Sequence, residues 1–302
     1  MIKKLKKLRA LISYAAKLEM LQEEQQLLMA KLLIKQIKDV DHVDTLEEIE
    51  FKVFSQWGDD GIIQWLINHL DIPNKTFIEF GVGDYRESNT RFLMMNNNWS
   101  GLVMDGSKKN ITKIINSEYN WKYELTAKQA FVTRENINRL ISEQGFDEEI
   151  GLLHIDIDGN DYWIWKEINC INPIIVIMEY NALFGVERPI TIPYSADFNV
   201  AQAHYSHLYF GASLRALDYL ANQKAYSFIG CNSAGNNAYF IRDDKLTNKV
   251  KPVTLEQGFI LIKTRQSRNE KGELNYLTGE SRVNVIRGMP VLNVISGETE
   301  DL

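Results

Sequence analysis

The chain has 302 residues, of which 45% are apolar and 25% are charged. This length and balance are those of an ordinary soluble globular protein with room for one large α/β domain and extensions. The formal net charge of −6 argues against a general nucleic-acid binder, because such proteins usually carry a basic excess. The two cysteines, Cys170 and Cys231, are too few for a disulfide framework or a cysteine-rich metal site. We expect both to be small buried residues of a protein in a reducing compartment.

The first part of the chain, residues 1–50, is predicted to be a helical extension. Apolar residues recur there at spacings of three and four, which indicates an amphipathic helix or a helical hairpin. The basic residues near its start can rest on an anionic membrane surface, and the alternatives are a solvated helix face or a dimerisation helix. The apolar centre is short and lacks a convincing cleavage site, so a signal peptide is not indicated. No run reaches the ~18 to 20 apolar residues that span a bilayer, and we expect a cytoplasmic protein. The apolar faces are Leu5, Leu8, Ile12, Ala15 and Ala16, then Leu28, Leu32 and Ile37, and the basic residues are Lys3, Lys4, Lys6, Lys7 and Arg9.

From about residue 76 onward, strand and helix patterns alternate. Continuous apolar strands in such an alternation indicate a parallel sheet covered by helices on both faces. The last two strands are joined by Ser-Ala-Gly-Asn, which is hairpin-like turn chemistry and makes the final strand antiparallel. In chain order the expected strands are 76–81, 100–107, 128–133, 151–158, 173–181, 225–232 and 237–244, and the expected helices are 88–97, 111–119, 135–144, 161–169 and 212–224.

These elements predict an α/β fold: a Rossmann-like, seven-stranded, mostly parallel sheet with helices on both faces and a closing antiparallel hairpin. The N-terminal helical extension precedes it. We assign residues 51–245 to this domain and residues 246–302 to a C-terminal tail or edge extension. Weak strand signals at 259–264 and 284–295 lie in that tail.

A first group of candidate site residues follows the first two predicted strands. In an open parallel sheet, ligands bind beyond the carboxyl ends of the strands. Gly81 and Gly83 allow a tight turn and close approach to a ligand, and Glu79 can reach a polar group of that ligand. Asp105, followed by Gly106, ends the second strand, where an acid accepts hydrogen bonds from the ribose hydroxyls of a nucleoside cofactor. Asp105 alone could equally cap the next helix, but together these features predict a nucleoside-cofactor site.

A second group consists of acids around the end of the fourth predicted strand, in the sequence His-Ile-Asp-Ile-Asp-Gly-Asn-Asp. Asp156 and Asp158 are two residues apart on a strand, so we expect them to point the same way, together with His154. Asp161 either joins them or is the N-cap of the helix that follows. Glu179 ends the next strand and adds a further carboxylate. We expect Asp156 to lie near the reactive end of the cofactor.

Four stretches in this order, EFGVGDYRESNT, LVMDGS, HIDIDGNDYWIWKEI and IVIMEYN, resemble the FkbM-type group of class I S-adenosylmethionine-dependent methyltransferases. The family's Ile-Asp-x-Glu-Gly-x-Glu motif is matched at 155–161, with aspartate in place of glutamate. The segment FSQWGDDGIIQWL is similar to the family's Ser-Gln-x-x-x-Asp helix start, which would bring Ser55, Gln56, Asp59 and Asp60 near the cofactor. The resemblance covers about residues 51–245. It implies S-adenosylmethionine as cofactor and O-methylation, commonly of a sugar hydroxyl on a small-molecule or glycan acceptor.

Methyl transfer to a hydroxyl requires that the two reactants are held in line and that the hydroxyl proton is removed. Clustered carboxylates raise one another's pKa, which can make Asp156, Asp158 or Glu179 an effective base. The same carboxylates could instead bind a divalent metal such as Mg²⁺, which would hold the substrate oxygens and acidify the hydroxyl.

The irregular stretch 185–211 is too long for an ordinary connection and is predicted to be a lid or a substrate loop. Within it, Arg188 can pair with a phosphate or carboxylate of the substrate. His204 or His207 offers an alternative general base. Aromatic side chains near the acids suit the faces of sugar rings, although we expect at least one of Trp163 and Trp165 to pack in the core.

Two other classes of function are compatible with the sequence. A non-catalytic nucleotide-binding scaffold would keep the fold and use the N-terminal helices to recruit partners, and a homo-oligomer is among the expected assemblies. An NAD-dependent oxidoreductase is disfavoured by the closing hairpin and by the absence of the third glycine of the dinucleotide fingerprint after Gly81 and Gly83. Cofactor binding without turnover would favour the scaffold.

Overall fold

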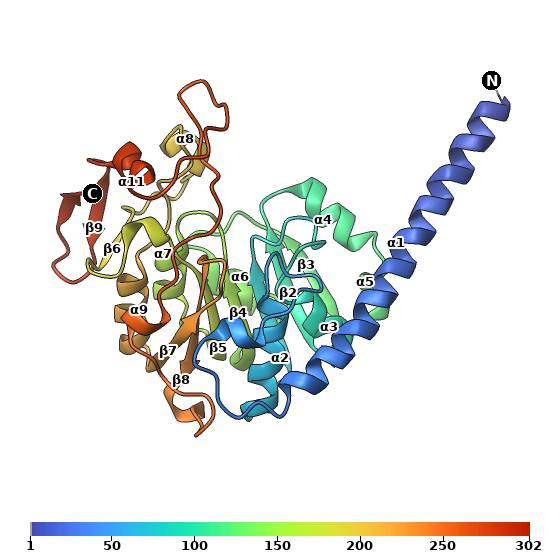
Figure 1. The fold of residues 1–302 in the computed structure, drawn as a ribbon, viewed down its shortest axis with the longest axis horizontal. Helices are drawn as coiled ribbons and strands as arrows, with labels where there is room; N and C mark the ends of the chain where they lie inside the picture. The colour runs from blue at the N-terminus through green and yellow to red at the C-terminus, as the bar shows by residue number, and fades with distance from the viewer. Residues whose placement is uncertain (1) are drawn as a thin grey trace.

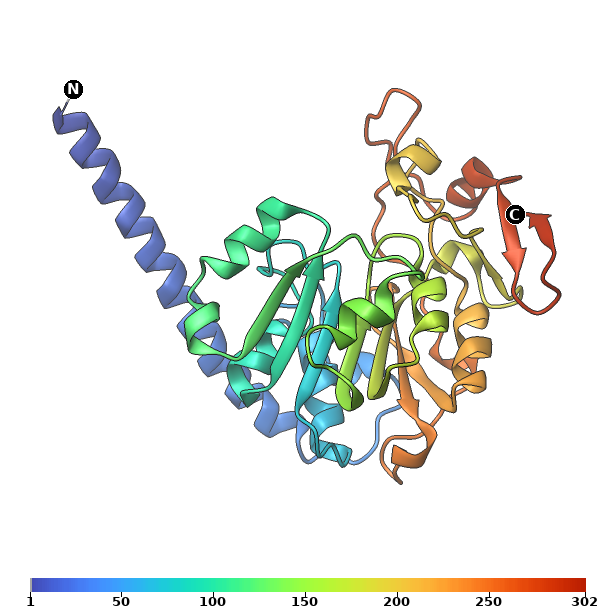
Figure 2. The same cartoon turned by 180° about the vertical axis from the view of Figure 1, so that it is seen from behind.

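The computed structural model describes residues 2–302, apart from some of the side chains between positions 2 and 19. Its centre is a seven-stranded sheet with strand order β3-β2-β1-β4-β5-β8-β7 (Figures 1 and 2). The strands from β3 to β5 in that order run parallel, whereas β8 is antiparallel to both of its neighbours. The predicted architecture and its closing hairpin are therefore confirmed. The strands are β1 (Thr76–Phe80), β2 (Ser100–Asp105), β3 (Leu125–Gln129), β4 (Glu148–Ile155), β5 (Ile171–Glu179), β7 (Tyr226–Cys231) and β8 (Asn237–Arg242).

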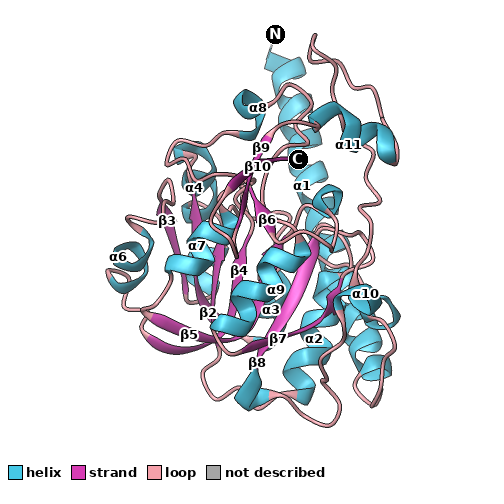
Figure 3. Ribbon diagram, turned by 90° about the vertical axis from the view of Figure 1, so that its left-hand side faces the viewer, coloured by secondary structure: helices cyan, strands magenta, loops and turns pink. Residues whose placement is uncertain are grey.

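Helices cover both faces of this sheet (Figure 3). Because side chains alternate along a strand, successive residues of β1 enter different cores: Phe77 packs on one face and Ile78 on the other. The core that contains Phe77 is covered by α1 (Ile2–Ile37), η1 (Leu46–Ile49), α2 (Asp59–His69), α3 (Arg91–Asn97) and α4 (Lys108–Ile115). The core that contains Ile78 is covered by α6 (Ile137–Ser142), α7 (Asp161–Glu167) and α9 (Leu214–Gln223).

The N-terminal extension contains one long helix, α1, rather than a helical hairpin. Its second half packs on the domain through buried Ala30 and Ile37, and Glu23 lies 2.7 Å from Arg91 of α3. Its first half projects away from the domain (Figure 1). None of the helices in residues 2–302 is long and apolar enough to cross a membrane. Part of the prediction for this helix rested on Lys3, Leu5, Leu8, Arg9, Ile12 and Ala16, whose side chains lie outside the described part of the structure.

The largest boundary differences lie near the edge strand β3. This strand covers Leu125–Gln129 instead of 128–133 and is half-exposed, so it needs no continuous apolar run. The apolar residues 130–132 that suggested a strand lie beyond its end. The helix predicted at 111–119 is divided into α4 and a short α5 (Tyr119–Lys122).

The C-terminal residues build a second, smaller sheet with part of the predicted lid. β6 (Ile190–Thr191), β9 (Pro290–Asn293) and β10 (Thr299–Asp301) pair antiparallel in the order β10-β9-β6. This sheet lies with α8 (Val200–Ala203) and α11 (Glu280–Ile286) above one end of the large sheet (Figures 1 and 2). Residues 259–264 form a loop rather than the predicted strand, because their half-buried apolar side chains pack on the core without a strand partner. The remaining short elements are η2 (Ala182–Phe184), η3 (Asp243–Lys245) and α10 (Leu255–Gly258).

Candidate functional site

Two adjoining hollows open at the carboxyl ends of the parallel strands, where an open sheet of this kind binds ligands. The larger one, the main cleft, has a volume of about 690 Å³, and the smaller one, the side pocket, has a volume of about 220 Å³. Gly81, Asp156 and Asp158 line both. The two hollows therefore meet where β1 and β4 end.

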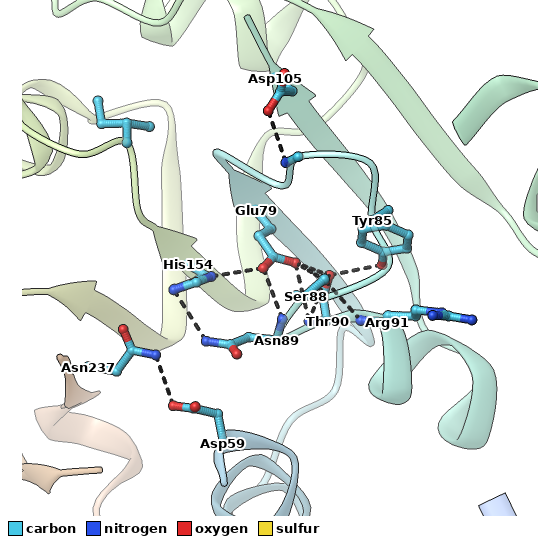
Figure 4. Close-up of polar contacts among 12 residues, drawn as sticks. Asp59, Glu79, Tyr85, Ser88, Asn89, Thr90, Arg91, Asp105, His154 and Asn237 are labelled. Atoms are coloured by element: carbon cyan, nitrogen blue, oxygen red, sulfur yellow. Dashed lines mark hydrogen bonds and ion pairs between the residues drawn. The ribbon is translucent and has the colours of Figure 1, made fainter. Parts of the chain in front are cut away.

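The turn after β1 is shaped by its two glycines. Gly81 has a φ of +77°, and a Cβ at this position would lie 1.7 Å from the carbonyl oxygen of Asp156, so a larger residue would collide with the loop after β4. Gly83 has a φ of +55°, and its N–H donates to Asp105 Oδ2 over 2.9 Å (Figure 4). The turn is thus held against both β2 and β4, with its backbone in the wall of the main cleft.

Asp105 lies half-buried at the end of β2 and lines the side pocket together with Gly106. Besides the bond from Gly83, it accepts hydrogen bonds from Ser107 N (2.7 Å) and Asn110 Nδ2 (3.2 Å). Asp105 therefore contacts the start of α4, but Ser107, and not Asp105, is the N-cap residue of that helix. Oδ2 has a single donor among the described residues, which leaves it capacity to accept another hydrogen bond.

Glu79 anchors the loop that follows the glycine turn (Figure 4). Its carboxylate accepts hydrogen bonds from Ser88 Oγ (2.6 Å), Asn89 N (3.0 Å) and Thr90 Oγ1 (2.5 Å). The parallel register sets it opposite His154, whose Nδ1 lies 2.9 Å from Oε1. Burial alone would raise the pKa of Glu79, but the hydrogen bonds from His154, Ser88 and Thr90 bring the pKa below its ordinary value. Both oxygens are occupied by protein donors, although the residue lines the main cleft.

A second group of carboxylates comes from Asp156, Asp161 and Glu179, which each offer an oxygen within 4.8 Å of the others. Burial raises the pKa of Asp156 to about 7 and that of Asp161 to about 6. Burial and the neighbouring acids raise the pKa of Glu179 well above its ordinary value, and its Oε2 is buried without a hydrogen-bond partner. This group therefore retains protons at a pH where isolated carboxyls have lost them.

Asp156 and Asp158 follow β4 instead of lying on it, because the strand ends at Ile155. The strand-alternation argument for their common direction is therefore wrong, yet both residues line the main cleft. Asp158 has a φ of +57°, an uncommon left-handed conformation for a residue with a Cβ. It is exposed within the cleft, where partial loss of water raises its pKa and His207 opposes the rise.

Asp161 organises the loop between Asp158 and α7. It is almost fully buried, and it accepts hydrogen bonds from Ile157 N (2.8 Å) and Gly159 N (2.9 Å). These bonds run back into the loop, and Asn160 occupies the N-cap position of α7. One of the two possibilities from the sequence was that Asp161 is the N-cap of this helix. It is instead the first residue of the helix.

The start of α2 and the residues just before it were predicted to bring four residues to the cofactor, and of these only Gln56 lines either hollow. Asp60 Oδ2 accepts hydrogen bonds from the N–H groups of residues 53–55 and from Ser55 Oγ. Asp59 accepts from Asn232, Asn237 and Tyr239. These buried acids hold the segment in place, and Gln56 and the next residue, Trp57, form part of the cleft wall.

The irregular stretch 185–211 contributes His207 to the main cleft. His204 lines neither hollow, and its Nδ1 lies 2.7 Å from Ser206 Oγ. Arg188 donates to Glu300 Oε2 (2.5 Å) and to the carbonyl of Asp301 (3.0 Å), so it binds the C-terminal strand instead of facing the cleft. As expected for one of the two tryptophans, Trp165 is buried in the core.

Two groups of lining residues were missed from the sequence. Phe131 and Val132 line the side pocket, but their apolar run had been assigned to a strand. Thr264, Gln266 and Arg282 of the C-terminal tail line the main cleft. An aromatic residue two positions beyond the end of a strand could have indicated Phe131. The tail residues carried no local signal, because only the return of the chain over the sheet brings them there.

No protein-family model and no curated protein matches the chain. Among solved structures it is similar to the pyocyanin biosynthetic protein PhzM (9% identity, TM-score 0.36, over 61% of this chain and 54% of that one). It is also similar to the CurJ carbon methyltransferase (9%, 0.39, 63% and 56%) and to an S-adenosylmethionine-dependent methyltransferase from Clostridium acetobutylicum (8%, 0.38, 61% and 89%). The chain thus spans little more than half the length of the first two. At TM-scores below 0.5 these likenesses carry no functional argument.

Proposed function

We propose that the chain is an S-adenosylmethionine-dependent O-methyltransferase, with the nucleoside end of the cofactor in the side pocket and the acceptor in the main cleft. The observation that carries this proposal is the meeting of the two hollows at Gly81 and Asp156. There, a glycine turn bound to Asp105 lies beside carboxyls of raised pKa. Transfer between two bound reactants requires such a junction of a cofactor pocket and an acceptor cleft, with a base at hand.

The residues of the side pocket suit a nucleoside. Phe131 is 59% exposed and offers a ring face for stacking on a base. Val132 adds apolar surface, and Asp105 can accept a further hydrogen bond from a ribose hydroxyl. Gly81 and Gly83 keep the cleft wall free of side chains on the way to Asp156. When bound, S-adenosylmethionine supplies an electrophilic methyl group, and these residues hold it beside the main cleft.

We propose Asp156 and Glu179 as the proton acceptor of the reaction. Burial and Asp158 raise the pKa of Asp156, and burial and Asp156 raise that of Glu179, so the pair keeps a proton near neutral pH and titrates as a unit. A base with a pKa near 7 takes up a hydroxyl proton more effectively than an ordinary carboxylate does. Asp158 and His207, which also line the cleft, are proposed to bind the acceptor. His204 has less support, because it does not line the cleft.

A divalent metal such as Mg²⁺ is the second candidate for the same carboxylates. Carboxylate oxygens are the ligands it prefers, and the unpartnered Glu179 Oε2 fits such a role. Against it, both oxygens of Asp161 already accept backbone hydrogen bonds, which fully accounts for the position of this acid. We therefore favour the shared proton as the source of the base.

The acceptor is proposed to be a sugar or glycan-precursor hydroxyl. The amides of Gln56, Asn89 and Asn236 in the cleft wall can exchange hydrogen bonds with several hydroxyls, and Trp57 offers an apolar face for a sugar ring. The two free thiols, on Cys170 and Cys231, support a reducing, cytoplasmic setting for this reaction.

Calorimetry with S-adenosylhomocysteine, the demethylated product, tests the cofactor assignment. The wild-type chain is expected to bind it, and Asp105→Ala is expected to weaken binding about tenfold or more, because a buried hydrogen bond to a charged group is lost. Asn110→Ala is the matched control, since it removes another contact of Asp105 outside the pocket. Equal affinity in wild type and Asp105→Ala would remove the nucleoside assignment.

Product formation separates the remaining alternatives. Formation of S-adenosylhomocysteine with a panel of sugar nucleotides and sugar phosphates supports an enzyme, whereas cofactor binding without turnover on any acceptor supports the nucleotide-binding scaffold. Turnover that a chelator leaves unchanged favours the shared proton. Turnover that is lost with chelator and restored by Mg²⁺ favours the metal.

A further inference from the structure

A buried arginine without an acidic partner lies in the wall of the main cleft. Arg282 of α11 is 5% exposed. Its Nη1 donates to the carbonyl of Thr264 (2.6 Å) and its Nη2 to that of Gln266 (3.3 Å), while Nε is buried without a partner. All three residues line the cleft. In residues 2–302 the structure gives Arg282 no ion pair with a described acidic side chain.

The other buried arginines of the described chain have carboxylate partners. Arg91 lies 2.7 Å from Glu23, and Arg242 lies 2.5 Å from Glu149 and 2.6 Å from Asp244. Burial lowers the pKa of Arg282, whereas at Arg242 the same effect of burial is outweighed by Asp244 and Glu149, which raise the pKa of that guanidinium. A buried charge without a counterion is unfavourable, and chains normally pair such charges. Arg282 is the exception, and it is the member of the three that lines the cleft.

We propose that Arg282 binds an oxyanion, a phosphate or carboxylate group of the acceptor, so that the acceptor is an acidic sugar derivative and not a neutral one. This inference rests on the proposed function of the main cleft as the acceptor site. The proposal assigns to Arg282 the role that the sequence suggested for Arg188, because Arg188 is already paired with Glu300 of the C-terminal strand. Guanidinium groups suit this role, because they bind planar or tetrahedral oxyanions through several N–H groups at once.

The test compares thermal unfolding of the full chain in sodium phosphate, sodium acetate and sodium chloride at equal ionic strength. A bound anion stabilises the folded chain by mass action, so phosphate, acetate or both should raise the Tm of the wild type above its value in chloride. Arg282→Gln should lose this rise and bind the same anion about tenfold or more weakly in a titration followed by tryptophan fluorescence. A rise in phosphate alone would indicate that Arg282 binds a phosphate group, and a rise in acetate alone would indicate a carboxylate.

Arg265→Gln is the matched control, since Arg265 is an exposed arginine of the same tail that donates to the carbonyl of Tyr276 and does not line the cleft. Arg282→Lys keeps the charge and covers the case in which the glutamine variant fails to fold. An equal anion-dependent rise in wild type and Arg282→Gln, or none in the wild type, would overturn the proposal. Calorimetry with S-adenosylhomocysteine reports separately on the proposed function, because Arg282 does not line the side pocket.

The outer face of α1 carries a stripe of exposed apolar side chains. The inner face, with Leu27, Ala30, Ile34 and Ile37, packs on the domain. On the opposite face, exposed apolar residues alternate at spacings of three and four, interrupted by a single polar residue, Gln25. The members of this outer stripe, with their exposed fractions, are Leu11 (55%), Tyr14 (62%), Leu18 (47%), Leu21 (42%), Leu28 (64%) and Leu32 (62%).

An alternation of three and four residues is the seven-residue repeat of a coiled coil, in which the stripe meets a second helix. The stripe is narrow, and the positions flanking it on one side carry Lys17, Glu24 and Lys31. A membrane-bound helix has instead a broad apolar face with basic flanks.

We propose that the outer stripe binds the same helix of a second copy of this chain, in antiparallel orientation. In that pairing Leu18 faces the partner's Leu21, and Leu11 faces the partner's Leu28. Lys17 then lies beside the partner's Glu24, and the two-fold symmetry of the pair repeats this contact, so two pairs of opposite charges form across the interface. A parallel pairing would instead stack Gln25 on its own copy and would bring no opposite charges together across the stripe.

Light scattering on the full chain tests this pairing. The wild type is expected to be a dimer, and the double variant Leu18→Asp, Leu21→Asp a monomer with unchanged S-adenosylhomocysteine binding. Met20→Asp, which changes an exposed apolar residue off the stripe, should remain a dimer. A disulfide between chains carrying Lys17→Cys and chains carrying Glu24→Cys supports the antiparallel order. A monomeric wild type, a disulfide between two Leu18→Cys chains, or binding to phosphatidylserine vesicles that only the stripe variant loses would each overturn it.

Discussion

Two buried groups of acids lie at the same edge of the sheet and differ in how the protein treats them. Glu79, at the end of β1, receives hydrogen bonds from Ser88, Asn89, Thr90 and His154, and its pKa is lowered. Asp156 and Glu179, after β4 and at the end of β5, have raised pKa values, and one oxygen of Glu179 has no partner.

The difference shows that burial alone does not decide the charge of a carboxyl. Burial is the largest single influence on Glu79 as well as on Asp156. At Glu79 the hydrogen-bond donors outweigh the effect of burial on the pKa, whereas at Asp156 the neighbouring acids Asp158 and Asp161 raise the pKa further. An acid saturated by protein donors serves the fold, whereas acids left without donors are available to a ligand or a proton.

The largest expected effect is on stability at the saturated acid. Glu79→Ala should lower the free energy of unfolding by about 3–5 kcal/mol, because it leaves a buried imidazole and several donors without a partner. Glu87→Ala, on the same loop but exposed and 3.4 Å from Lys52, should cost about 1 kcal/mol or less. Urea unfolding measures both. A loss below about 1 kcal/mol for Glu79→Ala would contradict the assignment of Glu79 to the fold.

The two groups should also respond to pH with opposite sign. The unfolded chain ionises Asp156 near its ordinary pKa of 3.8, whereas the folded chain keeps the proton up to about pH 7. Its contribution to stability is therefore present at low pH and is lost as the pH rises from about 4 to about 7, by at most about 4 kcal/mol. Glu79 contributes the reverse, because its lowered pKa makes its stabilisation disappear as the pH falls.

Urea unfolding at a series of pH values measures these slopes. Asp156→Asn should reduce the decline in the free energy of unfolding between about pH 4 and pH 7. It should leave the pH dependence below about pH 4 unchanged. The same variant should lower turnover about a hundredfold or more while S-adenosylhomocysteine binding changes little, because the base is lost. An equal slope in wild type and Asp156→Asn through this pH range would show that Asp156 is ionised in the folded chain.

The sheet could be predicted from the sequence because each central strand is a continuous apolar run. The same rule failed at β3, since an edge strand does not need such a run, and it misassigned Phe131. The acids at the strand ends were also recognisable, since a carboxylate after an apolar run is unusual. Their separation into two groups was not, because it depends on donors from the 88–90 loop and on the register that sets His154 opposite Glu79.

Contacts between distant parts of the chain were beyond sequence reasoning. Arg188 was expected to pair with a phosphate or carboxylate of the substrate, but it pairs with Glu300, 112 residues further along the chain. Arg282 was not singled out at all, although it lines the cleft. Neither position has a local pattern, because Arg188 meets Glu300 only through the small sheet of β6, β9 and β10, and Arg282 meets the carbonyls of Thr264 and Gln266 only where the tail folds back over the cleft.

The smallest expected effect tests the contact that links the two acid groups. Gly81→Ala and Gly83→Ala both add a Cβ at a positive φ, which costs about 1 kcal/mol in each. Only at Gly81 would the Cβ meet the carbonyl of Asp156, at 1.7 Å, while at Gly83 nothing lies within 4 Å. Gly81→Ala should therefore lose about 1–3 kcal/mol more than Gly83→Ala in urea unfolding. It should also shift the pH at which the Asp156 contribution is lost, because the loop after β4 must move. Equal losses and equal pH profiles in the two variants would mean that the turn after β1 does not hold the Asp156 loop in place.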